Sequence, residues 1–263
     1  MQARQLSFAH GAIWLVEGLR LWRRNPALLT FASFTYLLLI VLVSSLPLLG
    51  QPVAFLIMPA LSLGVVNTCR AIDEGRKAGP EILFSGFKQN LPALVTVGGI
   101  YLVGNLLVLA STSLFDGGLL VKLMSGAVQL DPEADEVPGL ATSLIAATLL
   151  STPVVMAYWF APVLSGWYAV SAPKAMFFSF VSCLRNWRPF LAFAITMMLF
   201  YGLLPGVVIG ILGLISPFLS TLVLLLLPML LVPVLFASFY INIRDVFGID
   251  LRDDAPDDEQ QAG

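Results

Sequence analysis

The chain has 263 residues, of which 58% are hydrophobic and 11% charged, and its formal net charge is −2. A soluble globular protein carries about 25% charged residues, so this composition, with a mean hydropathy of +0.90, excludes a soluble domain. It predicts an all-α polytopic membrane protein.

The first predicted element is an amphipathic helix in the N-terminal segment, which would lie in the headgroup plane of the membrane. A cleaved signal peptide is not expected, because the first strongly apolar run begins only after Pro26 and a second follows directly. The helix has an apolar face, formed by Phe8, Ala12, Leu15, Leu19 and Trp22, and a polar face, formed by Glu17, Arg20 and Arg24.

Six transmembrane helices are predicted from four stretches without any charged residue, at 25–69, 89–115, 137–173 and 189–243. A helix needs about 20 apolar residues to cross the hydrocarbon core, so the first and last stretches each hold two crossings and the others hold one. The fourth span contains Pro153 and Pro162, which predict a tilt, kink or break. The spans are 28–49, 53–69, 92–113, 141–170, 190–214 and 219–241, with tight connectors at 46–52 and 215–217.

The segment between the third and fourth spans, residues 114–140, is the one large predicted outer loop, with a short helix around 119–130 before an acidic run. Residues 1–252 are expected to form a single integral membrane domain. The tail at 253–263 is acidic and lacks large apolar residues, which predicts disorder.

Orientation follows from lysine and arginine, which are retained on the cytoplasmic side during membrane insertion. An arrangement with both termini inside leaves every lysine and arginine except Lys122 on that side. The outer loop that holds Lys122 is otherwise acidic. The sequence therefore predicts a membrane protein with both termini in the cytoplasm.

An internal threefold repeat is also predicted, with units at about 8–77, 80–170 and 172–248. Each unit would comprise a cytoplasmic interfacial helix, a crossing out and a crossing back, which implies a pseudo-threefold axis along the membrane normal. The alternative is that Asn and Pro merely punctuate bilayer helices, which are rich in Pro. The three copies read LWRRNPALLTF, GFKQNLPALVTV and CLRNWRPFLAF, with asparagines at Asn25, Asn90 and Asn186 and return-helix prolines at Pro59, Pro162 and Pro233.

The Trp-Arg-Arg-Asn-Pro segment, the Pro-Ala-Leu-Ser return helix and CLRNWRPFL together resemble a family of proteobacterial inner-membrane proteins. That family is similar, more distantly, to the YciC-like proteins and the glycerophosphodiester-phosphodiesterase membrane domain. The resemblance covers nearly the whole chain, but its motifs are architectural. It implies a bacterial inner-membrane location and supplies no catalytic residues.

Catalysis is not expected, because the sequence lacks a cluster of acid, base, nucleophile or metal ligands in the spans. His10 is the only histidine, and no phosphate loop or zinc-protease motif is present. Cys69 and Cys183 fall at the predicted cytoplasmic face, where thiols stay reduced. We therefore expect no enzyme activity, no cofactor, no metal site and no nucleic-acid partner.

Two functions remain open. The first is a noncatalytic scaffold or lipid-interacting protein, with membrane lipids, another membrane protein or a second copy as partner. Its candidate contacts with anionic lipid are Arg20, Arg23, Arg24, Arg185 and Arg188, since basic side chains beside a membrane attract acidic headgroups. The alternative is a transporter or facilitator of a small solute or lipid that is not coupled to ions, with Asn105 and Ser165 as the candidate intramembrane polar site.

Overall fold

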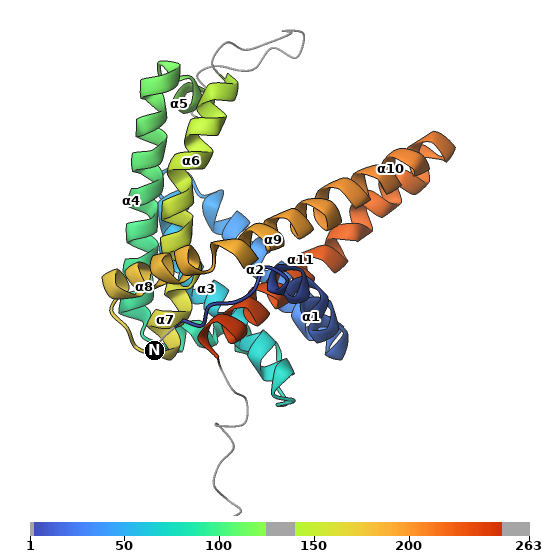
Figure 1. Ribbon diagram of the computed structural model, residues 1–263, viewed down its shortest axis with the longest axis horizontal. Helices are drawn as coiled ribbons and strands as arrows, with labels where there is room; N and C mark the ends of the chain where they lie inside the picture. The colour runs from blue at the N-terminus through green and yellow to red at the C-terminus, as the bar shows by residue number, and fades with distance from the viewer. Residues whose placement is uncertain (1–2, 125–139, 249–263) are drawn as a thin grey trace, which may run out of the picture. The chain divides into compact units, whose positions relative to one another are not determined.

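The computed structural model describes residues 3–124 and 140–248, and this part of the chain contains helices and no strand (Figure 1). The acidic run of the outer loop, Arg252 and the C-terminal tail lie outside the described residues. The elements in chain order are α1 (His10–Arg24), α2 (Pro26–Ser44), α3 (Gly50–Asp73), η1 (Pro80–Lys88), α4 (Leu91–Asp116), α5 (Leu119–Met124), α6 (Leu140–Trp159), α7 (Ala161–Trp167), α8 (Ala172–Arg185), α9 (Trp187–Met197), η2 (Met198–Leu203), α10 (Leu204–Ile215) and α11 (Pro217–Phe247).

Six helices within the described residues are long and apolar enough to cross a membrane, which confirms the predicted number. They correspond in order to the six predicted spans, and each contains most of the matching predicted span. The helices are Pro26–Ser44, Gly50–Asp73, Leu91–Asp116, Leu140–Trp167, Trp187–Ile215 and Pro217–Phe247. The internal repeat and the orientation of the termini stay predictions.

The fourth span, for which Pro153 and Pro162 predicted a tilt, kink or break, is interrupted next to Pro162, between α6 and α7. Pro162 lies in the first turn of α7, where its missing N–H costs no hydrogen bond. A hydroxyl from α8 enters the interrupted ladder, since the Phe160 backbone N–H donates to Ser179 Oγ at 2.8 Å and Ser179 Oγ donates to the Met156 carbonyl at 2.7 Å. Pro153 lies inside α6. The position of the break is thus held by a side chain distant in sequence.

The fifth span contains a feature that the sequence did not predict. Between α9 and α10 the chain forms a π-helix, η2, which is a rare conformation that often occurs at functional sites. The hydroxyl of Tyr201, within this segment, donates to the Leu231 carbonyl of α11 at 2.9 Å. This bond ties the π-helix to the sixth span.

The described residues group into two compact units, and α2 and α3 contribute to both. One unit comprises residues 3–39, 61–86 and 185–248, and the other comprises 40–60, 87–124 and 140–184. In the second unit α4 packs against α6, with the rings of Tyr101 and Tyr158 stacked at 4.2 Å between centroids. The expectation of a single domain over residues 1–252 stays a prediction.

In the first unit α1 lies against α9 and α11 (Figure 1). The contact depends on glycine, because a Cβ on Gly18 would meet the backbone of Ser238 and one on Gly11 would meet the carbonyl of Pro189. Trp14 is completely buried and packs edge-on against Phe190 and Phe193. Close approach through small residues is a common way for helices to associate in membranes. α1 is therefore docked on the transmembrane helices.

The docked face of α1 is not the apolar face predicted from sequence. Its buried residues are Gly11, Trp14, Leu15, Gly18 and Leu21, whereas Phe8 and Ala12 are exposed. The helix thus has two apolar surfaces, one packed on protein and one left uncovered. The second is suited to contact lipid.

Candidate functional site

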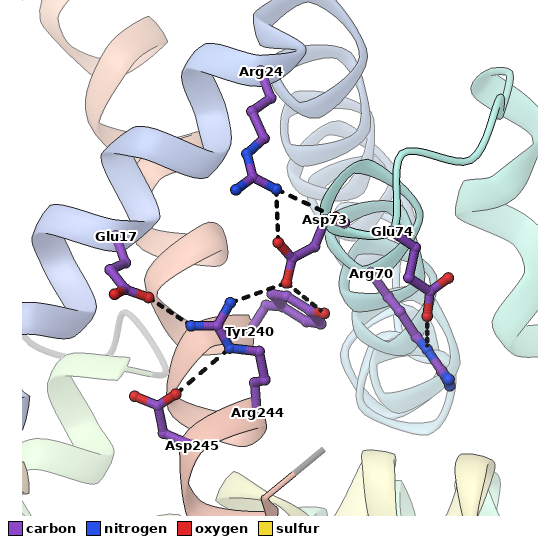
Figure 2. A network of polar contacts seen from close by, with 8 residues as sticks. All are labelled: Glu17, Arg24, Arg70, Asp73, Glu74, Tyr240, Arg244 and Asp245. Atoms are coloured by element: carbon purple, nitrogen blue, oxygen red, sulfur yellow. Dashed lines mark hydrogen bonds and ion pairs between the residues drawn. The ribbon is translucent and has the colours of Figure 1, made fainter. Parts of the chain in front are cut away.

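Charged side chains gather where α1, α3 and α11 meet in the first unit (Figure 2). In α3 and α11 these side chains follow a long apolar run, and in α1 they lie on the polar side of an amphipathic helix. We refer to eight residues here as the polar network: Glu17, Arg24, Arg70, Asp73, Glu74, Tyr240, Arg244 and Asp245.

Asp73, at the end of α3, lies at the centre of the polar network and its side chain is only 4% exposed. Its Oδ1 accepts a hydrogen bond from Arg24 Nη1 at 2.9 Å. Its Oδ2 accepts from Arg244 Nη1 at 3.1 Å and from the Tyr240 hydroxyl at 3.2 Å. One carboxylate therefore connects α1, α3 and α11.

Arg244 extends these links from α11 toward α1. Its Nη2 lies 2.6 Å from Glu17 Oε2 and its Nε lies 3.5 Å from Asp245 Oδ1. The indole N–H of Trp14 donates to Asp245 Oδ2 at 3.0 Å. The buried Trp14 thus contributes both apolar packing and a charged hydrogen bond to the docking of α1.

Glu74 forms the outer part of the polar network with two arginines. It accepts from Arg70 at 2.6 Å and from Arg76. Burial raises the pKa of Glu74, but the hydrogen bonds from Arg70 and Arg76 outweigh it, so the net shift is downward. Beside these residues lies a polar hollow of about 350 Å³ lined by Arg24, Asp73 and Arg76, among others.

The polar network is paired throughout, which decides what it can do chemically. Each of its carboxylates accepts from a guanidinium, an indole or a phenol. Buried charges are tolerated when they are paired in this way, and removing one partner is costly. The polar network therefore holds helices together and presents no free acid or base.

No group of three or more His, Cys, Asp or Glu residues that could hold a metal ion occurs within residues 3–124 and 140–248. The expectations of no metal and no cofactor stay predictions. Cys69 and Cys183 are both free thiols and both buried.

The five arginines predicted to bind lipid differ in their surroundings. Arg24 pairs with Asp73, and the guanidinium of Arg188 lies 5.6 Å from the centroid of the Trp187 ring. Arg20, Arg23 and Arg185 are exposed and form no ion pair within the described part of the chain.

These arginines form two groups. Pro189, beside Arg188, contacts Gly11 at the start of α1, whereas Arg20 and Arg23 lie at the other end of that helix. A helix rises about 1.5 Å per residue, so the two ends of α1 are roughly 20 Å apart. Arg20 and Arg23 therefore define a separate basic surface.

The two polar residues predicted to form an intramembrane site are not brought together. Asn105 Nδ2 donates to the Tyr101 carbonyl of its own helix at 2.7 Å. Ser165 is buried in α7, and its carbonyl accepts from Asn90 Nδ2 at the start of α4 at 2.9 Å. Asn105 lies fifteen positions further along α4, at a distance of roughly 22 Å by helix rise. Neither side chain is placed to share a ligand with the other.

The three asparagines of the predicted repeat stabilise helix ends in different ways. Asn25 Oδ1 accepts from the Leu28 backbone N–H at 3.2 Å, as a helix cap does. Asn90 has a positive φ of 43° and its side chain bonds to α7. Asn186 is buried and bonds to the N-terminal segment at the Leu6 N–H and the Arg4 carbonyl, both at 3.0 Å. Only contacts distant in sequence explain the last two.

Six helices long and apolar enough to cross a membrane indicate an integral membrane protein. The chain is 37% identical over 259 residues to a protein of Burkholderia thailandensis named "Probable inner membrane protein BTH_II0599", and the match covers 95% of each chain. The chain belongs to the family of that inner-membrane protein.

No family model matches the chain, and no solved structure matches it. The more distant resemblance to the YciC-like proteins and to the phosphodiesterase membrane domain is not supported by these comparisons.

Proposed function

We propose that the protein is a noncatalytic inner-membrane protein that binds anionic lipid at the cytoplasmic surface through Arg20 and Arg23 of α1. Both termini would lie in the cytoplasm, as the distribution of lysine and arginine predicts. The observation that carries the proposal is that these two guanidinium groups are exposed and lack an ion-pair partner among the described residues, whereas the arginines of the polar network are engaged.

The docking of α1 supports this proposal because it fixes the helix backbone that carries the two arginines before a lipid binds. Gly18 and Trp14 hold the helix against α9 and α11, so the backbone has little further conformational entropy to lose. Each basic side chain near an anionic leaflet contributes about 1 kcal/mol. Two of them would thus favour an anionic over a zwitterionic headgroup by roughly tenfold to thirtyfold.

The pairing of the polar network supports a noncatalytic role. Its carboxylates are committed to Arg24, Arg70, Arg76 and Arg244, so none is available as a general base. The transporter alternative lacks comparable support, because Asn105 and Ser165 lie far apart along α4 and α7. The role of a scaffold for a second membrane protein stays a prediction, and we assign no surface of the described residues to such a partner.

Lipid-dependent stabilisation tests the proposal. Phosphatidylglycerol added to the detergent-solubilised protein should raise its melting temperature more than phosphatidylcholine does. The double variant Arg20→Gln/Arg23→Gln should lose most of that difference and keep the melting temperature of the lipid-free wild type. Lys77→Gln, which removes another exposed cation, is the matched control and should behave as wild type. An unchanged phosphatidylglycerol effect in the double variant would refute the proposal.

A further inference from the structure

A groove in the first unit runs between α1, the fifth span and α11, and has a volume of about 350 Å³. Ligand pockets in proteins usually measure about 300–1,000 Å³. Buried Leu15 and Val234 line it, together with the half-exposed side chains of Val16, Phe200 and Leu204. The π-helix η2 supplies Phe200 and Tyr201 to one wall.

The lining of the groove determines the polarity of its occupant. It contains no charged residue, and its two hydroxyl groups belong to Thr196 and Tyr201. Thr196 donates to the Ala192 carbonyl at 2.8 Å and Tyr201 donates to the Leu231 carbonyl at 2.9 Å. With both protons committed, the groove offers no hydrogen-bond donor from these side chains. A polar solute would lose its hydration there without compensation, whereas an alkyl chain would not.

The groove continues along α1 into the basic surface. Ala12, Val16 and Leu19 line the groove, and one helical turn further along the chain stand Arg20, four residues after Val16, and Arg23, four residues after Leu19. Side chains four positions apart are neighbours on a helix, so Arg23 continues the groove face and Arg20 lies between that face and the polar face of α1. The apolar lining therefore ends at two exposed guanidinium groups without an ion-pair partner in the described chain.

We propose that this groove binds one acyl chain of an anionic membrane phospholipid whose phosphate lies at Arg20 and Arg23. The occupant combines the two chemistries that α1 displays, an alkyl tail for the groove and a negative charge for its basic end. Two of its walls, the fifth span and α11, belong to helices long and apolar enough to cross the bilayer, so lipid tails would reach the groove from the membrane. The position of the headgroup rests on the proposed function, and the position of the tail rests on the groove alone.

Photo-crosslinking in vesicles tests this inference with a phosphatidylglycerol that carries a diazirine in one acyl chain. The wild-type protein in phosphatidylcholine vesicles should be labelled mainly on peptides 196–208 and 223–234. Leu204→Trp, which fills the groove, should reduce this labelling at least fivefold. Leu203→Trp is the matched control. Leu203 is the preceding residue, its exposed fraction of 59% is close to the 53% of Leu204, and it does not line the groove.

A second pair of variants keeps the test independent of folding at one position. The pair is Leu230→Trp and Leu225→Trp. Leu230 lines the groove on α11, whereas Leu225 is exposed on the same helix outside the groove. Equal labelling of Leu204→Trp and Leu203→Trp, or label spread evenly over the exposed leucines of α10 and α11, would overturn the groove. If a diazirine phosphatidylcholine labels as well as phosphatidylglycerol while Leu204→Trp still blocks both, the anionic headgroup and the proposed function are refuted and the acyl-chain groove stands.

Discussion

At the scale of single residues, Asp73 connects three helices through its carboxylate. It accepts from Arg24, Tyr240 and Arg244. Asp73→Asn keeps the shape and removes the charge, so it should lower the free energy of unfolding by about 1.5–3 kcal/mol, the range for a charged hydrogen bond. Most of this loss would come from Arg244, because Arg24 is 57% exposed and its pair is screened by solvent.

Thermal unfolding in detergent would measure the effect of Asp73→Asn. Glu81→Gln is the control, since Glu81 is an exposed carboxylate of η1 and its loss should leave the melting temperature unchanged. If the two variants melt together, Asp73 does not hold α3 to α11.

Cys183 gives a prediction about pH. Burial raises the pKa of its thiol to about 12, against a smaller lowering by Ser179. The protonated thiol is favoured in the folded protein, so this contribution to stability is complete below pH 9 and is lost as the pH rises from 9 toward 12. Only the thiolate reacts with alkylating reagents.

Maleimide labelling of the folded protein at pH 7 should therefore leave Cys183 unmodified, and iodoacetamide at pH 9 should modify it slowly. A cysteine in place of Lys174, which is exposed on the same helix, should react at the rate of a small thiol. Equal rates at the two positions would show that α8 does not bury Cys183.

At the scale of helices, Gly18 distinguishes helix propensity from packing. Alanine is a better helix former than glycine by about 1 kcal/mol, so propensity alone predicts that Gly18→Ala stabilises α1. The structure predicts the opposite sign, because the added Cβ would meet the backbone of Ser238 and overpacking costs about 1–3 kcal/mol. Gly210→Ala, where nothing lies within 4 Å, should be neutral or stabilising. A higher melting temperature for Gly18→Ala would mean that α1 is not docked on α11.

The sequence was sufficient for features set by composition and local chemistry. Charge-free runs fix the six spans, and Pro162 fixes the start of α7. It was insufficient where a distant contact decides the outcome. Ser179 enters the break between α6 and α7 from another helix, and no local pattern distinguishes it from other serines. The π-helix around Tyr201 and the docked face of α1 likewise depend on α11.

The candidate sites show the same division. Arginines near the ends of helices were visible in the sequence, but their pairing was not, so Arg24 and Arg23 looked alike. Only the approach of Asp73 separates them. Asn105 and Ser165 were predicted to form one site because both are polar within apolar runs, although the structure places Ser165 in α7 beside the start of α4 and Asn105 fifteen residues further along α4.

For the complete chain, we propose that α1 and its basic surface lie at the cytoplasmic face. The positive-inside distribution supports it, since Lys122 is the one basic residue predicted outside. Anionic lipid of the inner leaflet could reach Arg20 and Arg23 only in this orientation.

Site-directed cysteine labelling in spheroplasts tests this orientation. Both native cysteines are buried, so the wild-type protein supplies the background. With a maleimide that does not cross the inner membrane, Lys122→Cys in α5 should be labelled in spheroplasts, and Arg23→Cys in α1 should be labelled only after the membrane is permeabilised. The reverse pattern, with Arg23→Cys labelled from outside and Lys122→Cys protected, would contradict the orientation and with it the proposed binding of lipid from the cytoplasmic leaflet.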